Sequence, residues 1–191
     1  VSTGIVTSGT GRRPFQPTMA MKLYGPTGRS NRVKAVAGWT GVPLEQPPFT
    51  MGVTNRTPEF LAKNPFGKVP VLETPDGECI FESNAIARFL ASSACSTLYP
   101  PAAVTRARID AWMDAFNTLD CIGPLWFYPI VGIGADRGLT HDPANVAKAQ
   151  ATLRAFLAVL EAHLAGNTYL VGDAITLADV IGANALEVVY M

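Results

Sequence analysis

The spacing of hydrophobic positions changes about halfway along the chain. Between residue 21 and about residue 95, short apolar runs typical of strands alternate with stretches whose apolar residues recur every three or four positions. From about residue 102 onward only the helical spacing is found. Alternating strands and helices form layered structures, whereas helices alone pack as bundles. The pattern therefore predicts an α+β chain of two domains, mixed in the first half and all-helical in the second.

The first half is predicted to follow the order β-α-β-α-β-β-α, which is that of a thioredoxin-like domain. The expected strands cover residues 21–25, 42–49, 68–73 and 78–81. Helices are expected over residues 29–40 and 83–92, and a helix of one or two turns is expected between them, starting at Pro58. Thr57 before Pro58 is typical of a helix start, and Asn64-Pro65 should end that helix. The turn TPDG should join the last two strands as a hairpin. The strand over 42–49 is predicted at a sheet edge because of its prolines.

The second half is predicted to contain three helices. Residues 105–120 and 145–166 each carry one apolar stripe, and the second should end at Gly166. A third helix should begin at a capping box in which Thr176 accepts from the Asp179 amide and the Asp179 carboxylate accepts from the Thr176 amide. No stop signal follows before residue 191, so we expect the chain to end inside a larger protein.

Composition and charge exclude several classes of partner. Fifteen basic and fifteen acidic residues leave no net charge, so no field attracts nucleic acid or an anionic membrane. The longest uncharged run, CIGPLWFYPIVGIGA, is too short to cross a bilayer. The three cysteines, Cys79, Cys95 and Cys121, have no metal-site spacing, so we expect no metal and buried free thiols in a reducing compartment.

Residues 1–18 differ in composition from the rest of the chain. They are rich in Ser and Thr, include two arginines and lack acidic residues, which is typical of a transit peptide; sequence upstream of a natural start fits equally well. We expect an extension at 1–18, a thioredoxin-like domain at 19–95 and a helical domain at 96–191. A cytoplasmic location is expected, with organellar import through residues 1–18 as the alternative.

The segment around Pro70 raises the question of a binding site. A proline in a strand removes a backbone donor, so Pro70 should lie at an open edge or follow a cis bond, which leaves Val69 with backbone groups turned outward. Ser83 as an N-cap would place helix amides and a partial positive charge nearby, which suits a carboxylate. These features fit a small acidic peptide. The alternative is that Pro70 only marks an edge and Ser83 only caps its helix.

Several motifs resemble the cytosolic glutathione transferase superfamily. Its glutathione-site signature is similar to NPFGKVPVLE followed by FESNAIARFL, and its helical capping motif is similar to LVGDAITLADV. The combination of TNRTPEFL, FESNAIARFL and WFYPIVG resembles more narrowly the transferase-like N-terminal domain of the elongation factor 1-gamma family, in its plant and algal forms. The resemblance implies a thioredoxin-like domain followed by an all-helical domain, and covers about residues 21–180.

The family implies roles for particular residues. Lys68 would approach the glycyl carboxylate of glutathione, Val69 would pair with the cysteinyl backbone, and Pro70 would be the cis-proline. Glu82 and Ser83 would hold the γ-glutamyl end. Glutathione is thus the expected ligand or substrate, with no metal.

A transferase also needs a group that stabilises the glutathione thiolate. Ser30 is the candidate catalytic residue, although Arg29 takes the place that direct alignment gives to the activating serine. Thr27 is the other hydroxyl nearby. Ser30 would serve equally well as an N-cap. Because the elongation factor family tends to lack an activating residue, weak or absent activity is expected.

The remaining candidate residues are interpreted as structural. His163 near a helix end suits the helix dipole, and His141 has no acid-base partner suggested by the sequence. Tyr24 is expected in the core, and the basic residues of RSNRVK on an exposed helix face. Core packing is also expected for four aromatic residues: Trp112, Trp126, Phe127 and Tyr128.

Two functions follow from the resemblance. The first is a scaffold subunit of the translation elongation factor 1 complex, which binds the nucleotide-exchange subunit and keeps a glutathione pocket. The alternative is an active glutathione transferase that conjugates small electrophiles. A homodimer is left open; neither nucleic acid nor a membrane is an expected direct partner.

Overall fold

A four-stranded sheet forms the centre of the first half of the molecule. The structure is a computed structural model and describes residues 19–135 and 138–187. The strands are β1 (Met21–Tyr24), β2 (Leu44–Glu45), β3 (Val71–Glu73) and β4 (Cys79–Phe81). Their order is β2-β1-β3-β4, with β2 parallel to β1 and the other pairs antiparallel. The expectations for residues 1–18 and beyond residue 187 lie outside the described residues.

The β3–β4 hairpin forms as predicted, whereas the edge strand is shorter than predicted. Val71 pairs with Phe81, and the turn closes through a hydrogen bond from the Thr74 amide to the Glu78 carbonyl at 2.9 Å. Of the strand expected over residues 42–49, only β2 is formed. Prolines at 43, 47 and 48 cannot donate to a ladder, which restricts pairing to the short stretch between Pro43 and Pro47.

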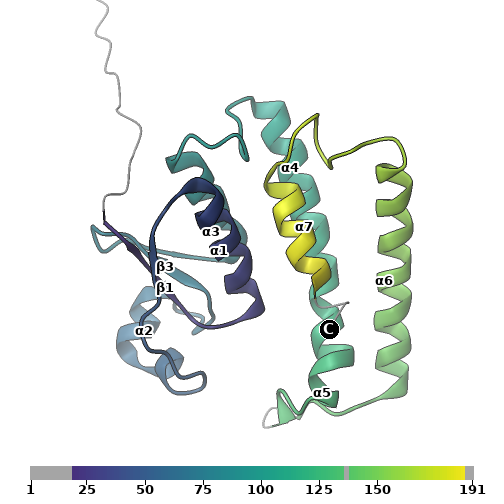
Figure 1. The fold of residues 1–191 in the computed structure, drawn as a ribbon. Coiled ribbons are helices and arrows are strands. Elements are labelled where there is room, and N and C mark those ends of the chain that lie inside the picture. The colour runs from purple at the N-terminus through teal and green to yellow at the C-terminus, as the bar shows by residue number, and fades with distance from the viewer. Residues whose placement is uncertain (1–18, 136–137, 188–191) are drawn as a thin grey trace, which may run out of the picture.

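Helices cover both faces of the sheet. They are α1 (Gly28–Thr40), α2 (Pro58–Lys63) and α3 (Ser83–Ser93). α1 and α3 lie side by side between the sheet and the helical half, and α2 packs on the opposite face through the ring of Phe60 against Tyr24 (Figure 1). The Thr57 cap is confirmed, since its hydroxyl accepts the Phe60 amide at 3.2 Å. The short helix predicted to start at Pro58 and stop at Asn64 is confirmed as α2, and a 3₁₀ turn, η1 (Thr54–Arg56), precedes it.

The second half is helical, as predicted, with one irregular stretch. Its elements are α4 (Ala103–Ala115), the 3₁₀ helix η2 (Phe116–Cys121), a π-helical segment (Gly123–Phe127), α5 (Tyr128–Ile130), α6 (Pro143–Leu164) and α7 (Leu177–Glu187). The α-helix predicted to reach residue 120 ends at Ala115, and residues 116–121 continue as the 3₁₀ helix η2. α6 ends at Leu164, two residues before the predicted Gly166.

The predicted capping box at the start of α7 is half confirmed. The Asp179 carboxylate accepts the Thr176 amide at 2.7 Å, as expected, and also the Leu170 amide at 2.9 Å. The Thr176 hydroxyl, however, donates to this carboxylate at 2.9 Å, whereas the Asp179 amide donates to the Thr176 backbone carbonyl. Asp179 therefore ties the preceding loop to the helix start through three hydrogen bonds.

One apolar core joins the two halves of the molecule. Leu23 and Ile86 of the first half belong to the same buried cluster as Ile109 and Ile181 of the second. The four aromatic residues expected to pack in the core are partly confirmed, because Trp112, Trp126 and Phe127 are half-buried against this cluster. α7 lies against α1 and α3, which fixes the helical half over the layer that covers the sheet (Figure 1).

Arg32 lies where the two halves of the molecule meet, and its burial differs from the prediction. Its side chain is only 5% exposed, although the basic residues of this helix were expected at the surface. Nε donates to the Asn184 side-chain oxygen at 3.1 Å and Nη1 to that of Asn84 at 3.2 Å. Burial lowers the pKa of the Arg32 guanidinium, because a charge loses solvation there. The arginine thus links α1 to α3 and α7.

The cysteines differ from their predicted burial. Cys95 is exposed, and Cys79 and Cys121 are half-buried, so the expectation of buried thiols is wrong. All three are free thiols, as expected. Within the described residues, no helix has the length and apolar character needed to cross a membrane.

Candidate functional site

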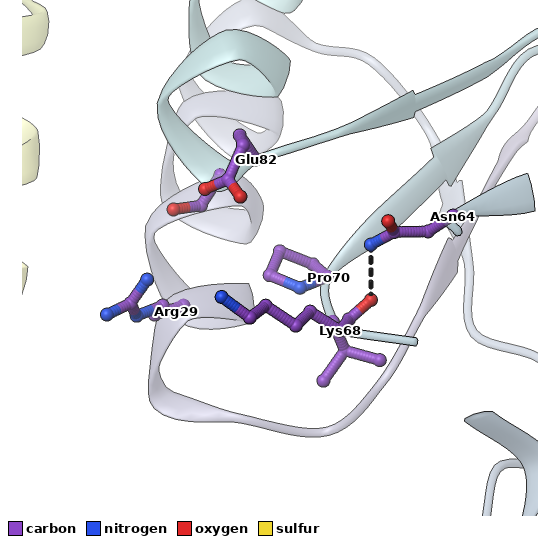
Figure 2. Close-up of a pocket in the computed structure, with 7 residues that line it drawn as sticks. Arg29, Asn64, Lys68, Pro70 and Glu82 are labelled. Carbon is purple, nitrogen blue, oxygen red and sulfur yellow. Dashed lines mark hydrogen bonds between the residues drawn. The ribbon is translucent and has the colours of Figure 1, made fainter. Parts of the chain in front are cut away.

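A cavity of about 90 Å³ lies where the start of α1, the loop before β3 and the start of α3 meet (Figure 2). It is lined by Arg29, Asn64, Lys68, Val69, Pro70, Glu82 and Ser83. The five residues that the family resemblance assigned to glutathione therefore lie around one cavity, although they come from two separate segments. Arg29 and Asn64 complete the lining. Ser30 is not part of it.

Two buried asparagines shape the loop that carries Lys68. The side-chain amide of Asn64, 2% exposed, donates to the Lys68 carbonyl at 2.8 Å, as Figure 2 shows. The Asn55 side chain donates to the Gly67 carbonyl at 2.9 Å. Gly67 has φ of 59°, and a Cβ there would lie 2.9 Å from the Asn55 carbonyl oxygen. The loop conformation therefore needs glycine at this position.

The peptide bond between Val69 and Pro70 is cis, as the family resemblance implied and as one of the two alternatives drawn from the residues alone predicted. Within the described part of the chain, no hydrogen bond takes up the backbone N–H or C=O of Val69. These two groups are available to an extended ligand, in the way that sheet edges bind peptides. The Val69 side chain packs closely on Gly25, in the loop before α1.

The start of α3 has features that suit an anion. Glu82 is the N-cap, with φ of 68° and ψ of 115°, and Ser83 is the first helical residue, so the prediction of Ser83 as N-cap is wrong by one position. A non-glycine residue at positive φ is strained, and such strain is concentrated at ligand sites. The amides of the first turn have no partner within the helix and carry partial positive charge. The Glu82 carboxylate makes no ion pair within the described ranges.

The hydroxyls at the start of α1 are engaged within the protein. Ser30 is 0% exposed, and its hydroxyl donates to the Gly25 carbonyl and accepts the Thr27 amide at 3.4 Å. Thr27 is the N-cap of α1, so the expectation that Ser30 occupies that position is wrong. Ser30 is the third residue after this N-cap, and its side chain holds the loop before α1 to the helix. Its catalytic role stays a prediction.

Arg29 connects the two halves of the molecule beside the cavity. Its guanidinium forms an ion pair with Asp120 of η2 at 2.7 Å. A second cavity of about 350 Å³ adjoins the first and shares three of its lining residues, Arg29, Glu82 and Ser83. Its other lining residues are Asn84, Ala85, Arg88, Asp114, Asn117 and Asp120. The larger cavity is therefore walled mainly by charged and polar side chains.

A separate cluster of charges lies on the face covered by α2. Glu73 accepts from Tyr24 at 2.8 Å and forms an ion pair with Lys63. The hydrogen bond from Lys63 holds the pKa of Glu73 below its usual value, and burial raises the pKa of Tyr24. Tyr24 is half-buried by this cluster rather than part of the apolar core. None of these residues lines either cavity.

The two histidines lie away from both cavities. His163 Nε2 is 3.0 Å from the Leu170 carbonyl oxygen, and its ring packs against Trp112 in a tilted arrangement, with centroids 4.7 Å apart. His141 is exposed before α6. Among the described residues, no group of three or more His, Cys, Asp or Glu side chains is placed to hold a metal ion.

Two lining residues were not assigned to the site from the sequence. Asn64 was interpreted only as a helix stop, and Arg29 only as a residue displacing a serine. The Asn-Pro-x-Gly spacing was a usable signal, because an asparagine before such a loop can hydrogen-bond its backbone. The pairing of Arg29 with Asp120 has no local signal, since the two residues come from different halves of the chain.

Comparisons with known proteins agree with this geometry. Family models described as glutathione S-transferase N-terminal domain and C-terminal domain match residues 19–92 and 118–191. Elongation factor 1-gamma 2 of rice, Oryza sativa subsp. japonica, is 44% identical over 168 residues, which are 85% of this chain and 39% of the rice protein. This chain thus spans well under half the length of that relative.

Two further proteins match this chain over most of their own length. Glutathione S-transferase-like protein FUS3 of Gibberella fujikuroi is 39% identical over 174 residues, which are 87% of this chain and 78% of that protein. The crystal structure of a theta class glutathione S-transferase from Xanthomonas axonopodis pv. citri, with glutathione bound, superimposes with a TM-score of 0.78 at 28% identity. The match covers 90% of this chain and 83% of that one.

Proposed function

This chain belongs to the glutathione S-transferase family, and from that membership we propose a scaffold domain of the translation elongation factor 1 complex that binds glutathione. Its similarity to elongation factor 1-gamma of plants supports the role in translation. The domain would bind the nucleotide-exchange subunit through its surface and act in the cytoplasm. A second copy of the chain is a further candidate partner.

The charges around the small cavity support glutathione as the ligand. Lys68 and Arg29 are cationic, Glu82 is anionic, and all three line the cavity (Figure 2). Glutathione has two carboxylates and one ammonium, which is the complementary set. We propose that Lys68 binds the glycyl carboxylate and Glu82 the ammonium. Ser83 and the first amides of α3 would bind the γ-glutamyl carboxylate.

The backbone of the cavity supports the same orientation. The unpaired N–H and C=O of Val69 would pair with the cysteinyl residue, between the two charged ends of the ligand. Pro70 is buried behind Val69 and would form the floor of the site. The theta class structure contains glutathione on the same fold, which supports the assignment of the cavity.

One observation carries the choice of scaffold over enzyme: the residues assigned to glutathione surround the cavity, whereas the hydroxyls of Thr27 and Ser30 at the start of α1 bond within the protein. The Ser30 hydrogen is donated to the Gly25 carbonyl. An activating serine must instead direct its hydroxyl at the glutathione sulfur, because the thiolate is stabilised by that hydrogen bond. We therefore propose binding with weak or absent turnover.

Copurification and calorimetry test the two parts of this proposal. The chain, tagged and mixed with the purified nucleotide-exchange subunit of a plant elongation factor 1 complex, should retain that subunit. Glutathione should bind in calorimetry, and Lys68→Ala should weaken it by about fivefold, since an exposed charge pair is worth about 1 kcal/mol. Lys148→Ala, an exposed lysine on α6, is the matched control. Failure to retain the subunit would remove the translation role.

An active transferase is the second candidate, and the intact cavity favours it. Conjugation of an aryl halide to glutathione separates the two functions. The scaffold proposal expects rates close to the uncatalysed reaction. Turnover at ordinary transferase rates that is lost in Ser30→Ala, with the variant still folded by circular dichroism, would establish the enzyme instead.

A further inference from the structure

Within the described ranges, Arg29 is the one side chain of α1 that lines the small cavity. Thr27 and Ser30, the hydroxyl residues of the same turn, bond to one another and to the loop before the helix. The loop itself reaches the segment before β3, because a Cβ on Gly25 would lie 2.4 Å from the Cβ of Val69. A ligand residue paired with Val69 would therefore have its side chain beside the start of α1.

For glutathione bound as proposed above, that side chain is the cysteinyl thiol. A guanidinium and the positive end of a helix both favour a thiolate over a thiol. We propose that Arg29 stabilises the thiolate of bound glutathione in place of a hydroxyl. We further propose that Asp120, by pairing with Arg29, weakens this stabilisation and keeps turnover low. The inference rests on the proposed glutathione site.

The Arg29–Asp120 pair has the properties that this role requires. The two charged groups are 2.7 Å apart, with 45% and 37% of their side chains exposed. An exposed pair adds little stability, so either residue can be changed without unfolding the protein. Asp120 belongs to η2 in the helical half, and it lines only the larger cavity. It acts on the thiol through Arg29 and is a positioning residue.

The charges around the thiol decide the direction of the effect. Arg29 of α1 and Lys68 before β3 are cationic, and Glu82 before α3 and Asp120 of η2 are anionic, so the four charges balance. Of the remaining charged lining groups, Arg88 pairs with Asp114 at 3.5 Å and more closely with Asp110 of α4 at 2.6 Å. Removal of the Asp120 charge makes the surroundings of the thiol more positive by one unit. The thiol then ionises more readily, and its proton passes to bulk water without any bond forming at sulfur.

The test measures the ultraviolet absorption of the glutathione thiolate against pH in the presence of the protein, with calorimetry to establish binding. Asp120→Asn should raise the thiolate fraction at neutral pH about three- to tenfold. This is the effect on the thiol pKa that is expected when a unit charge several ångströms away is removed in partly solvated surroundings. Arg29→Ala should lower it by a similar factor. Conjugation of an aryl halide should rise in Asp120→Asn in proportion. Asp173→Asn and Arg154→Ala, at exposed positions outside both cavities, are the matched controls.

The results separate this inference from the proposed function. If glutathione binds all variants but both Asp120→Asn and Arg29→Ala keep the thiol pKa of the controls, the role of Arg29 is refuted and the binding site stands. If Ser30→Ala alone abolishes the thiolate band, the hydroxyl is the stabilising group and Arg29 is not. If calorimetry detects no glutathione binding to the unmodified chain, the proposed site and this inference both fail.

Discussion

Gly25→Ala should damage both the fold and the cavity, because the loop before α1 lies against Val69. Gly25 has φ of +95°, and an added Cβ would lie 2.4 Å from the Val69 Cβ and 2.5 Å from its Cγ1. Contacts this short require the β1–α1 loop or the segment before Pro70 to move. Val69 belongs to the backbone strip that we assign to the ligand, so such movement should be felt at the site.

The expected loss of stability has two parts. An alanine at positive φ costs about 1 to 2 kcal/mol, because its Cβ crowds the backbone. Overpacking costs about 1 to 3 kcal/mol more. The sum is about 2 to 5 kcal/mol, a large share of the about 5 to 15 kcal/mol that stabilises a typical domain. Glutathione affinity should fall with it.

Gly41 is a matched control for the cost of placing alanine at positive φ without overpacking. It ends α1 with φ of +71°, and an added Cβ there would have no atom within 4 Å. Gly41→Ala should therefore cost only about 1 to 2 kcal/mol. With a urea slope of about 2 kcal/mol/M, the midpoint of Gly25→Ala should lie about 0.5 to 1.5 M below that of Gly41→Ala.

Urea unfolding followed by circular dichroism, with glutathione calorimetry on each folded variant, checks this prediction. Equal midpoints for the two alanine variants would show that no packing conflict exists at Gly25. Unchanged glutathione affinity in Gly25→Ala would show that the loop and Val69 are not in contact as described. Either result would contradict the reasoning.

Two further predictions concern polar contacts outside the site. Glu73→Gln should make the free energy of unfolding depend less on pH in the acid range. The hydrogen bond from Lys63 lowers the folded-state pKa of Glu73. The stabilisation from this carboxylate is therefore present above the unfolded pKa of about 4.3 and is lost as pH falls through the lower folded pKa. Urea titrations at several pH values measure this, and parallel curves would contradict it. Asp179→Ala should lower the free energy of unfolding by about 1 to 3 kcal/mol, because the Leu170 and Thr176 amides lose their acceptor. Asp173→Ala is the control and should leave thermal unfolding unchanged.

Elements with local signals were predicted closely. The Thr57 cap, the TPDG hairpin and the reach from Asp179 to the Thr176 amide all join residues within a few positions of each other. The β-rich runs and the apolar stripes then fixed which faces were buried. Where these signals failed, as for the helix that ends at Ala115, the backbone continues as a 3₁₀ helix, which apolar spacing of three and four does not distinguish from an α-helix.

The candidate site was predicted in part. The family resemblance identified five residues that the fold brings around one cavity. It did not reveal that Ser30 is buried against Gly25, or that Asn64 holds the Lys68 carbonyl. Each of these depends on the path that a loop takes in three dimensions, which side-chain type and spacing alone do not determine.

The amino-acid sequence by itself determined the two-domain architecture, which follows from periodicity, and the family, which follows from motifs of adjacent residues; the cis bond before Pro70 was implied only by the resemblance to that family. Only the tertiary structure decided that Arg29 faces Asp120 and that Arg32 is buried between α3 and α7. The physical reason is distance along the chain: an ion pair or buried hydrogen bond between two domains depends on how their helices pack, and that packing is set by the whole core.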